Sequence, residues 1–350
     1  MSSKQFGGKI TKKWKAAYEV SEHWKNGKFQ NLMDTTLGVN FWNIPKMLYR
    51  QLCASKASYP KQNLPIKSLD LNAFLKEDTE PKFVWYGHSV LLMRLQGKSI
   101  LIDPMFGDDC SPIGPKRTKR FSANSLECIN HLPEIDLVLI THDHYDHLDY
   151  DSMLKLKNKV KNYFVALGAK RHLVSWGIES DKIAEFDWWD AKIFENIQIT
   201  FTPTRHFSGR GLSSMAKCLW GGWALKTENF NVWFSGDSGY GPHFKEIGNV
   251  LGPFDIGFME CGQYCEDWPD IHMFPNESVQ AATDAGVKNA VPVHWGGFNL
   301  SYQHDWFEPP EAFMKFAQKK NLDVLTPQLG QVFSINLPTE EWWKNLESNL

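Results

Sequence analysis

The chain of 350 residues is long enough for one large domain or two small ones with a sizeable core. Hydrophobic residues make up 42% and charged residues 22% of it, as in an ordinary globular protein. The formal net charge of −2 argues against a nucleic-acid-binding protein, which normally carries a dominant basic field.

Residues 1–80 are predicted to form an extension that packs on the rest of the protein. Residues 1–28 carry seven lysines against two glutamates, which suits either a solvated arm or contact with anionic lipid. A helix is predicted at 41–52, "FWNIPKMLYRQL". The start of the chain lacks the apolar region of a signal peptide, and no apolar stretch approaches the about 20 residues that span a bilayer. We therefore expect a cytoplasmic protein, at most peripheral to a membrane.

Short β-rich runs dominate residues 81–350, which we expect to form one domain. "FVWYGHSVLLMRLQGKSILIDP" predicts strands with a turn at Gln96 to Lys98, and the buried strand "IDLVLI" leads into "THDHYDH". The following "DYDSMLKLKNKV" has helical spacing. Later predicted strands end at His206, Asp237, Glu260 and His294. Because strand ends converge at one rim of a sheet system, these residues are predicted to line one cleft.

The motif "HDHYDH" has the spacing of a metal site. On an extended strand end, residues i and i+2 face the same side, so His142 and His144 can hold one ion. Asp146 and His147 follow on the turn into the predicted helix, where they are free to face a second ion. One short motif can therefore begin two adjacent metal sites.

Three residues at separate strand ends can complete these sites. His206 can join the first, His294 the second, and Asp237 can bridge both with its two oxygens. The set contains imidazole and carboxylate without thiolate, which favours two Zn²⁺ ions and also admits iron or manganese. Such cations activate water and polarise a substrate oxygen, so the expected reaction is metal-assisted hydrolysis.

These residues resemble the signature of the metallo-β-lactamase superfamily, His-x-His-x-Asp-His followed by a distant His, Asp and His. The resemblance covers about residues 81–335. It implies an α/β (α+β) fold, an αββα sandwich with a dinuclear metal site at one edge, and it makes 81–350 the hydrolase domain.

A narrower resemblance is to the N-acyl-phosphatidylethanolamine-hydrolysing phospholipase D family. It is carried by strings such as "HYDHLDYDS", "EFDWWD", "CLWGGWAL" and "HWGGF", and weakly by "NGKFQN" at 26–31. The resemblance implies the division of ligands given above, with Asp237 holding two zinc ions together and Asp146 also orienting the nucleophile. His272 and His304 match family histidines, and they are candidates for contacting phosphate or protonating the leaving oxygen, with structural roles as the alternative.

The chain departs from the family pattern at "MECGQYCEDW", which places Glu260 and two cysteines beside the predicted cleft. An extra carboxylate there would change which head group is tolerated. Cys261 and Cys265 are expected to be unpaired thiols. His88 and Asp103 are interpreted as supporting groups rather than ligands.

The basic string "GPKRTKRF", residues 114–121, has two interpretations: a solvated loop, or a positive rim that attracts phosphodiester head groups. The leading hypothesis is a dinuclear zinc phosphodiesterase that cleaves N-acyl-phosphatidylethanolamine to phosphatidic acid and N-acylethanolamine. Its partner would be a phospholipid or small phosphodiester, and family members pair, so a homodimer is one expectation. The alternatives are a hydrolase of a soluble lactone or of a cyclic or sugar phosphate, a redox diiron protein, and a non-catalytic, metal-stabilised lipid-binding module.

Overall fold

The computed structural model describes residues 3–37, 57–77, 80–111, 118–211, 214–301 and 303–348. The helix predicted at 41–52 lies outside these residues, as do Lys116 and Arg117 of the basic string. Within the described ranges, no helix is both long enough and apolar enough to cross a bilayer.

The first of two large sheets has seven strands in the order β16-β3-β4-β5-β6-β7-β8. The bounds are β3 Lys82–Trp85, β4 Leu91–Leu95, β5 Lys98–Ile102, β6 Ile135–Ile140, β7 Val160–Ala166, β8 Ile183–Phe186 and β16 Val332–Phe333. Strands β5 to β8 pair in parallel, and the others pair antiparallel. The run "IDLVLI" forms β6, and it is almost continuously apolar because a central parallel strand is covered on both faces.

The second sheet also has seven strands, in the order β15-β14-β13-β12-β11-β10-β9. The bounds are β9 Ala191–Phe194, β10 Ile197–Pro203, β11 Gly221–Lys226, β12 Asn231–Phe234, β13 Phe254–Glu260, β14 Val287–Val293 and β15 Asp323–Val324. Strands β12 to β15 pair in parallel, and β9 to β12 pair antiparallel.

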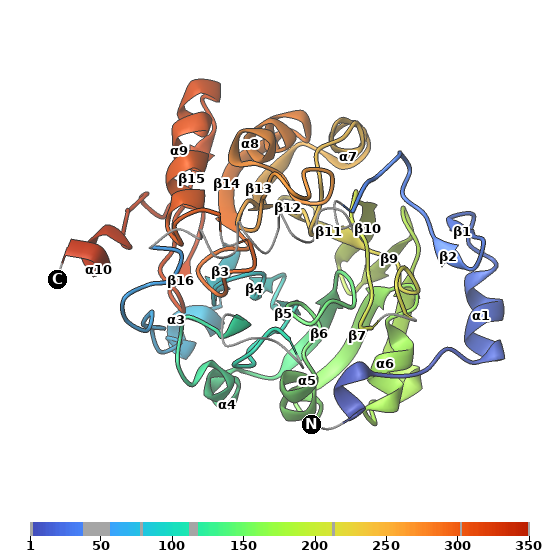
Figure 1. Ribbon diagram of the computed structural model, residues 1–350. Coiled ribbons are helices and arrows are strands. Elements are labelled where there is room, and N and C mark those ends of the chain that lie inside the picture. The colour runs from blue at the N-terminus through green and yellow to red at the C-terminus, as the bar shows by residue number, and fades with distance from the viewer. Residues whose placement is uncertain are drawn as a thin grey trace.

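The two sheets pack face to face through aromatic side chains. Phe83 of β3 lies 5.4 Å from Phe258 of β13, and Phe186 of β8 lies 5.2 Å from Trp223 of β11, between ring centroids. Helices cover the outer faces, as Figure 1 shows, with one group on each side. These are α4 Cys128–His131, α5 Tyr150–Leu156 and α6 Lys170–Ser175, and on the other side α7 His243–Leu251, α8 Pro275–Asp284 and α9 Glu308–Lys320. The predicted αββα sandwich is confirmed.

The described part of the N-terminal segment lies against this sandwich. It contains a 3₁₀ turn at Ser3–Phe6, helix α1 at Lys12–Tyr18 and the short strands β1 Trp24–Lys25 and β2 Lys28–Phe29. The backbone N–H of Phe29 donates to the Ala216 carbonyl over 2.9 Å, and Trp176 Nε1 donates to the Lys4 carbonyl over 2.7 Å. The remaining described elements are helices α3 Leu71–Leu75 and α10 Lys344–Ser348 and the 3₁₀ helices Ser125–Glu127 and Ser180–Lys182. The division of the chain at residue 80 stays a prediction.

Candidate metal centre

The predicted ligands all lie just beyond strand ends. The "HDHYDH" motif follows β6, which ends at Ile140. The second sheet contributes His206 after β10, Asp237 after β12 and His294 directly after β14. The structure brings all seven predicted ligands together at the edge where the two sheets meet.

Three imidazoles form the first cluster, with ring nitrogens close enough to share one ion. His144 Nδ1 lies 2.8 Å from His142 Nε2 and 3.3 Å from His206 Nε2. One nitrogen of each ring lies within 4.8 Å of the others. This is the set predicted for the first site.

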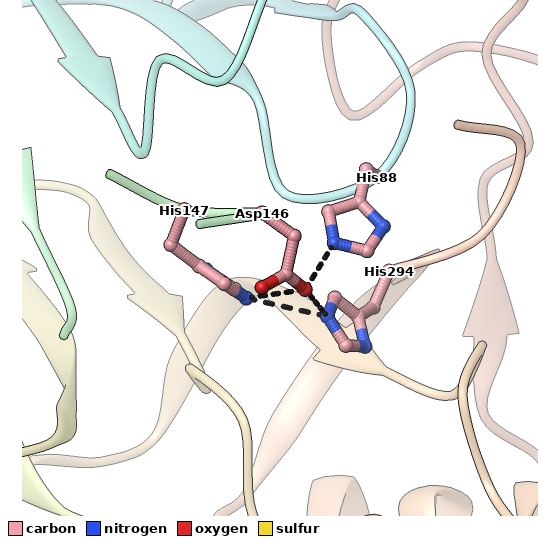
Figure 2. Close-up of side chains that lie close together, drawn as sticks. All are labelled: His88, Asp146, His147 and His294. Carbon is pink, nitrogen blue, oxygen red and sulfur yellow. Dashed lines mark hydrogen bonds and ion pairs between the residues drawn. The ribbon is translucent and has the colours of Figure 1, made fainter. Parts of the chain in front are cut away.

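The second cluster contains Asp146, His147 and His294, and Figure 2 shows their side chains pointing toward one another together with His88. His147 Nε2 and His294 Nε2 are 3.3 Å apart, and each lies 3.5 Å from Asp146 Oδ2. The three residues predicted for the second site therefore also converge.

Asp237 lies between the clusters. Its Oδ2 atom is 3.0 Å from His147 Nε2 and 3.2 Å from His294 Nε2 in the second cluster. The same atom is 3.8 Å from His206 Nε2 and 4.0 Å from His142 Nε2 in the first. A carboxylate in this position suits the predicted bridging role.

The hydrogen bonds behind the rings show that the cluster is suited to cations. The Thr141 hydroxyl donates to Asp103 over 2.6 Å, so it can only accept from His142 Nδ1, 3.0 Å away. His206 Nδ1 donates to the Ile271 carbonyl over 2.9 Å. In both rings the outer nitrogen therefore carries the proton, and the inner Nε2 presents a lone pair to the cluster. Two such lone pairs directed into one buried cluster are what a metal ion would satisfy.

Charge also favours cations in this buried site. Burial alone would lower the pKa of His147, but Asp237, Asp146 and Asp103 outweigh it and hold this pKa well above its usual value. Burial would likewise lower the pKa of His294, but Asp237, Asp146 and Glu260 raise it to about 9. Without metal, protons on these two rings balance the carboxylates, and divalent cations would take over that role.

Backbone conformation distinguishes three residues of the centre. His88, Asp103 and His294 have φ values of +53°, +41° and +69°, in the left-handed region that non-glycine residues rarely adopt. Such conformations persist where surrounding structure enforces them, and they concentrate at functional sites. Here they turn three side chains inward at strand ends.

Asp103 and His88 both contact predicted ligands. His88 is also close enough to Asp146, His147 and His294 to share an ion with them, so its interpretation as a supporting group stays a prediction. His147 Nδ1 donates to Asp103 Oδ2 over 2.8 Å, which orients this ring as a carboxylate typically orients a metal-binding histidine. His88 Nε2 lies 2.9 Å from Asp146 Oδ2, and its ring lies 4.1 Å from that of His294. Its Nδ1 atom has no hydrogen-bond partner in the described structure. The sequence did not predict which ligand His88 contacts.

Glu260 is buried beside His272 and His294, next to the cluster as expected, and its effect on the choice of head group stays a prediction. Its Oε1 atom accepts from His272 Nδ1 and from the Met273 backbone N–H, both over 3.1 Å. Its Oε2 atom lies 3.4 Å from His294 Nδ1, without the alignment of a hydrogen bond. Only 1% of the residue is exposed, so it can act on substrate only through its neighbours.

His272 reaches the cluster, whereas His304 does not. A ring nitrogen of His272 lies within 4.8 Å of ligand atoms of His206 and Asp237, and its side chain is 13% exposed. His304 Nε2 instead lies 2.7 Å from Ser301 Oγ, and its ring stacks on Tyr264 at 4.4 Å. These contacts favour the structural alternative for His304, and its catalytic role stays a prediction.

A buried network holds the metal-binding loop from behind. Asp143 accepts from Arg171 over 3.1 Å, from His172 Nε2 over 3.0 Å and from the Gly209 N–H over 2.7 Å. Burial would raise the pKa of Asp143, but His172 and Arg171 outweigh it and hold this pKa well below its usual value. Arg210 NH1 donates to the carbonyls of Asp143 and Leu148, which lie on either side of His144, Asp146 and His147 in the loop between β6 and α5. Sequence reasoning missed this network because its members have no characteristic spacing.

The structure also describes part of the basic string 114–121 and the two cysteines near Glu260. Arg120 is buried, and its guanidinium donates to the carbonyls of Tyr86, Gly107 and Met105, so neither interpretation of the string holds for this residue. Lys119 is exposed. Cys261 and Cys265 both keep their thiols and are not joined to each other, as predicted.

Comparisons with known proteins agree with this architecture. A family model described as "Beta-lactamase superfamily domain" matches residues 98–295. An uncharacterised protein of Mycobacterium tuberculosis is 35% identical over 340 residues, covering 94% of this chain and 89% of the relative. The N-acyl-phosphatidylethanolamine-hydrolyzing phospholipase D 1 of Caenorhabditis elegans is 29% identical over 312 residues, covering 83% and 87%. The mitochondrial enzyme of that name from Saccharomyces cerevisiae is 32% identical over 246 residues, covering 67% and 51%.

Solved structures show the same fold. Igni18, a metallo hydrolase from Ignicoccus hospitalis, has a TM-score of 0.57 at 20% identity, covering 74% of this chain and all of its own. The diiron beta-hydroxylase CmlA from Streptomyces venezuelae has a TM-score of 0.55 at 17% identity, covering 73% and 54%.

Proposed function

Because the chain belongs to the metallo-β-lactamase superfamily, a superfamily of metal-dependent hydrolases, we propose that it is a dinuclear zinc phosphodiesterase of phospholipase D type. Its substrate would be N-acyl-phosphatidylethanolamine, and its products phosphatidic acid and N-acylethanolamine. The observation that carries the proposal is the position of Asp237, whose Oδ2 atom lies within 4.0 Å of histidines from both clusters. The relatives named for this reaction support the choice of substrate class.

The residues would divide the work as follows. His142, His144 and His206 would hold one ion, and Asp146, His147 and His294 the other. Bound cations supply Lewis acidity and activate water. Asp237 would fix the distance between the two ion sites.

Access for the substrate would be on the side of the more exposed residues of the centre, among them His144, which is of intermediate burial. The side chains of Asp146 and His272 are 12% and 13% exposed, whereas His142 and His206 are almost fully buried. Asp146 would orient the attacking water from this side. His272 donates through Nδ1 to Glu260, which leaves Nε2 free to contact the phosphate or the departing alcohol oxygen.

The test uses zinc-loaded protein with vesicles that contain N-acyl-phosphatidylethanolamine, and mass spectrometry to detect both products. Wild-type protein should release phosphatidic acid and N-acylethanolamine together. Asp237→Asn should lower turnover by about 100-fold or more, since each ion site loses a charged ligand. Asp151→Asn, a change at an exposed aspartate of α5, is the matched control and should retain full turnover.

Two outcomes would contradict the proposal. Absence of both products from fully metallated protein would show that the substrate is different, and soluble lactones and cyclic or sugar phosphates would be tested next. Full turnover and full metal content in Asp237→Asn would show that the bridging assignment is wrong.

A further inference from the structure

The side chain of Asn31 forms a two-point clamp on the backbone of His206. Asn31 Nδ2 donates to the His206 carbonyl over 2.8 Å, and Asn31 Oδ1 accepts from the His206 N–H over 3.1 Å. These residues are 175 positions apart in the sequence. A residue of the N-terminal segment thus contacts a residue of the predicted first metal site.

The orientation of this amide is fixed by its partners. Asn31 Oδ1 accepts a second hydrogen bond, from Trp220 Nε1 over 3.0 Å, and Trp220 is almost fully buried. An indole N–H and a backbone N–H can only donate, and a carbonyl can only accept. The oxygen and nitrogen of Asn31 therefore cannot exchange places without losing all three bonds.

The clamp acts where the sheet no longer supports the chain. His206 lies three residues beyond Pro203, the last paired residue of β10. Asn31 bonds to the backbone N–H and carbonyl of His206, and His206 Nδ1 donates to the Ile271 carbonyl over 2.9 Å. These three bonds fix the ring with Nε2 facing His144 and Asp237.

Residues 34–36 extend the contact to the loop that carries His272. Arg205 donates to the Asp34 carbonyl over 2.6 Å and forms an ion pair with Asp270 at 3.0 Å. The backbone N–H of Thr36 donates to Asp270 over 2.9 Å, and its hydroxyl donates to the same carboxylate. The segment therefore ties together the loops of His206 and His272.

We propose that Asn31 is a positioning residue of the metal centre, required for tight binding of the ion held by His142, His144 and His206. A ligand free to shift binds its ion more weakly, and loss of a group that orients a ligand typically lowers metal affinity by about 10–100-fold. The proposal rests on the part of the proposed function that makes His206 a metal ligand, and it is independent of the substrate.

The test is a titration of metal-free protein with Co²⁺, followed by visible absorption, with no substrate present. Asn31→Ala should weaken binding of one of two equivalents by about 10–100-fold and leave the other at its wild-type affinity. Asn31→Asp keeps the acceptor but places an oxygen against the His206 carbonyl, so an intermediate loss is expected. Gln30→Ala changes an exposed neighbour whose side chain donates to the Lys25 carbonyl, and this variant should behave as wild type.

Melting temperatures of the metal-free proteins separate positioning from general stability. A purely structural role would lower the melting temperature of Asn31→Ala while both Co²⁺ affinities stayed at wild-type values, and that result would overturn the proposal. If Asn31→Ala does not fold, Asn31→Asp decides by the same two readouts. If wild-type protein binds no Co²⁺, His206 is not a ligand, and this proposal fails together with the metal part of the proposed function. Wild-type binding of two equivalents without lipid turnover would contradict only the proposed substrate.

Discussion

His88 contacts two predicted ligands at once: its Nε2 atom lies 2.9 Å from Asp146 Oδ2, and its carbonyl accepts from the His294 N–H over 2.9 Å. It lies in the connection between β3 and β4 of the first sheet, while His294 follows β14 of the second. One residue therefore couples the positions of two ligands that lie on different sheets.

His88→Phe is predicted to weaken the second ion site selectively. The variant keeps a ring against His294 but loses the bond to Asp146, so affinity for the ion held by Asp146, His147 and His294 should fall by about 10-fold. Isothermal titration of metal-free protein with Zn²⁺ measures both sites. The control is His23→Phe, which makes the same change at a histidine whose ring packs on Trp188. An equal loss at both sites would argue for general disruption.

Glu260→Gln is predicted to lower kcat on the proposed lipid substrate by about 10-fold or more, with KM little changed. The amide keeps an acceptor for Met273 but removes the charge beside His272 and His294. Steady-state kinetics with two different head groups measures the effect, and Glu266→Gln at an exposed position is the control. A changed preference between the two head groups at constant kcat would instead support the expectation from the sequence that Glu260 affects which head group is tolerated.

Arg210→Lys is predicted to lower the free energy of unfolding by about 3 kcal/mol, because lysine cannot replace the fork of donors that reaches three carbonyls. Those carbonyls belong to Gln5, Asp143 and Leu148. Urea denaturation of metal-free protein gives the value. Arg94→Lys, which affects a single 3.3 Å bond to Ser99, should cost much less. Similar decreases in the free energy of unfolding of both variants would contradict a special role of Arg210 in holding the loop.

Acid is predicted to destabilise metal-free protein partly through His243. Burial, with a smaller effect of Arg205, lowers the pKa of this residue to about 3, so it stays neutral in the folded state. In the unfolded chain it binds a proton below about pH 6.5, and stability therefore falls as the pH drops from about 6.5 toward 3.

The variant His243→Gln isolates this effect from that of other titrating groups. Between pH 6 and 5 the wild type should lose up to about 1.4 kcal/mol per pH unit more than the variant. Urea unfolding at several pH values measures the difference. Identical slopes would show that His243 is already protonated in the folded state.

Most of the centre was predictable because its residues follow strands. The i, i+2 spacing of His142 and His144 and the position of His294 directly after an apolar run both depend on local periodicity. The same periodicity predicted short strands whose ends meet at one rim, whereas the αββα sandwich with its two sheets was implied by the resemblance to the superfamily. Periodicity does not determine how deeply a side chain at a strand end is buried, and Glu260 is only 1% exposed.

Supporting residues left no comparable signal. Asn31 and His206 are 175 residues apart, and His88 and Asp146 are 58 apart. Such pairs meet only because the sheets and loops pack as they do, and an asparagine or arginine in a single sequence looks the same whether it is solvated or buried. Arg120 and Arg210 show this directly, since both are buried among carbonyl groups.

The division of the ligands between the two sheets has a consequence for the order of assembly. His144 and His206 are 62 residues apart, and His147 and His294 are 147 apart. Neither half of the chain contains a complete set, so tight capture of an ion requires that both sheets have formed and docked. An ion would therefore bind at the last stage of folding. By then the packed core already holds the two chain segments close together, so little further conformational entropy is lost when the ion joins them.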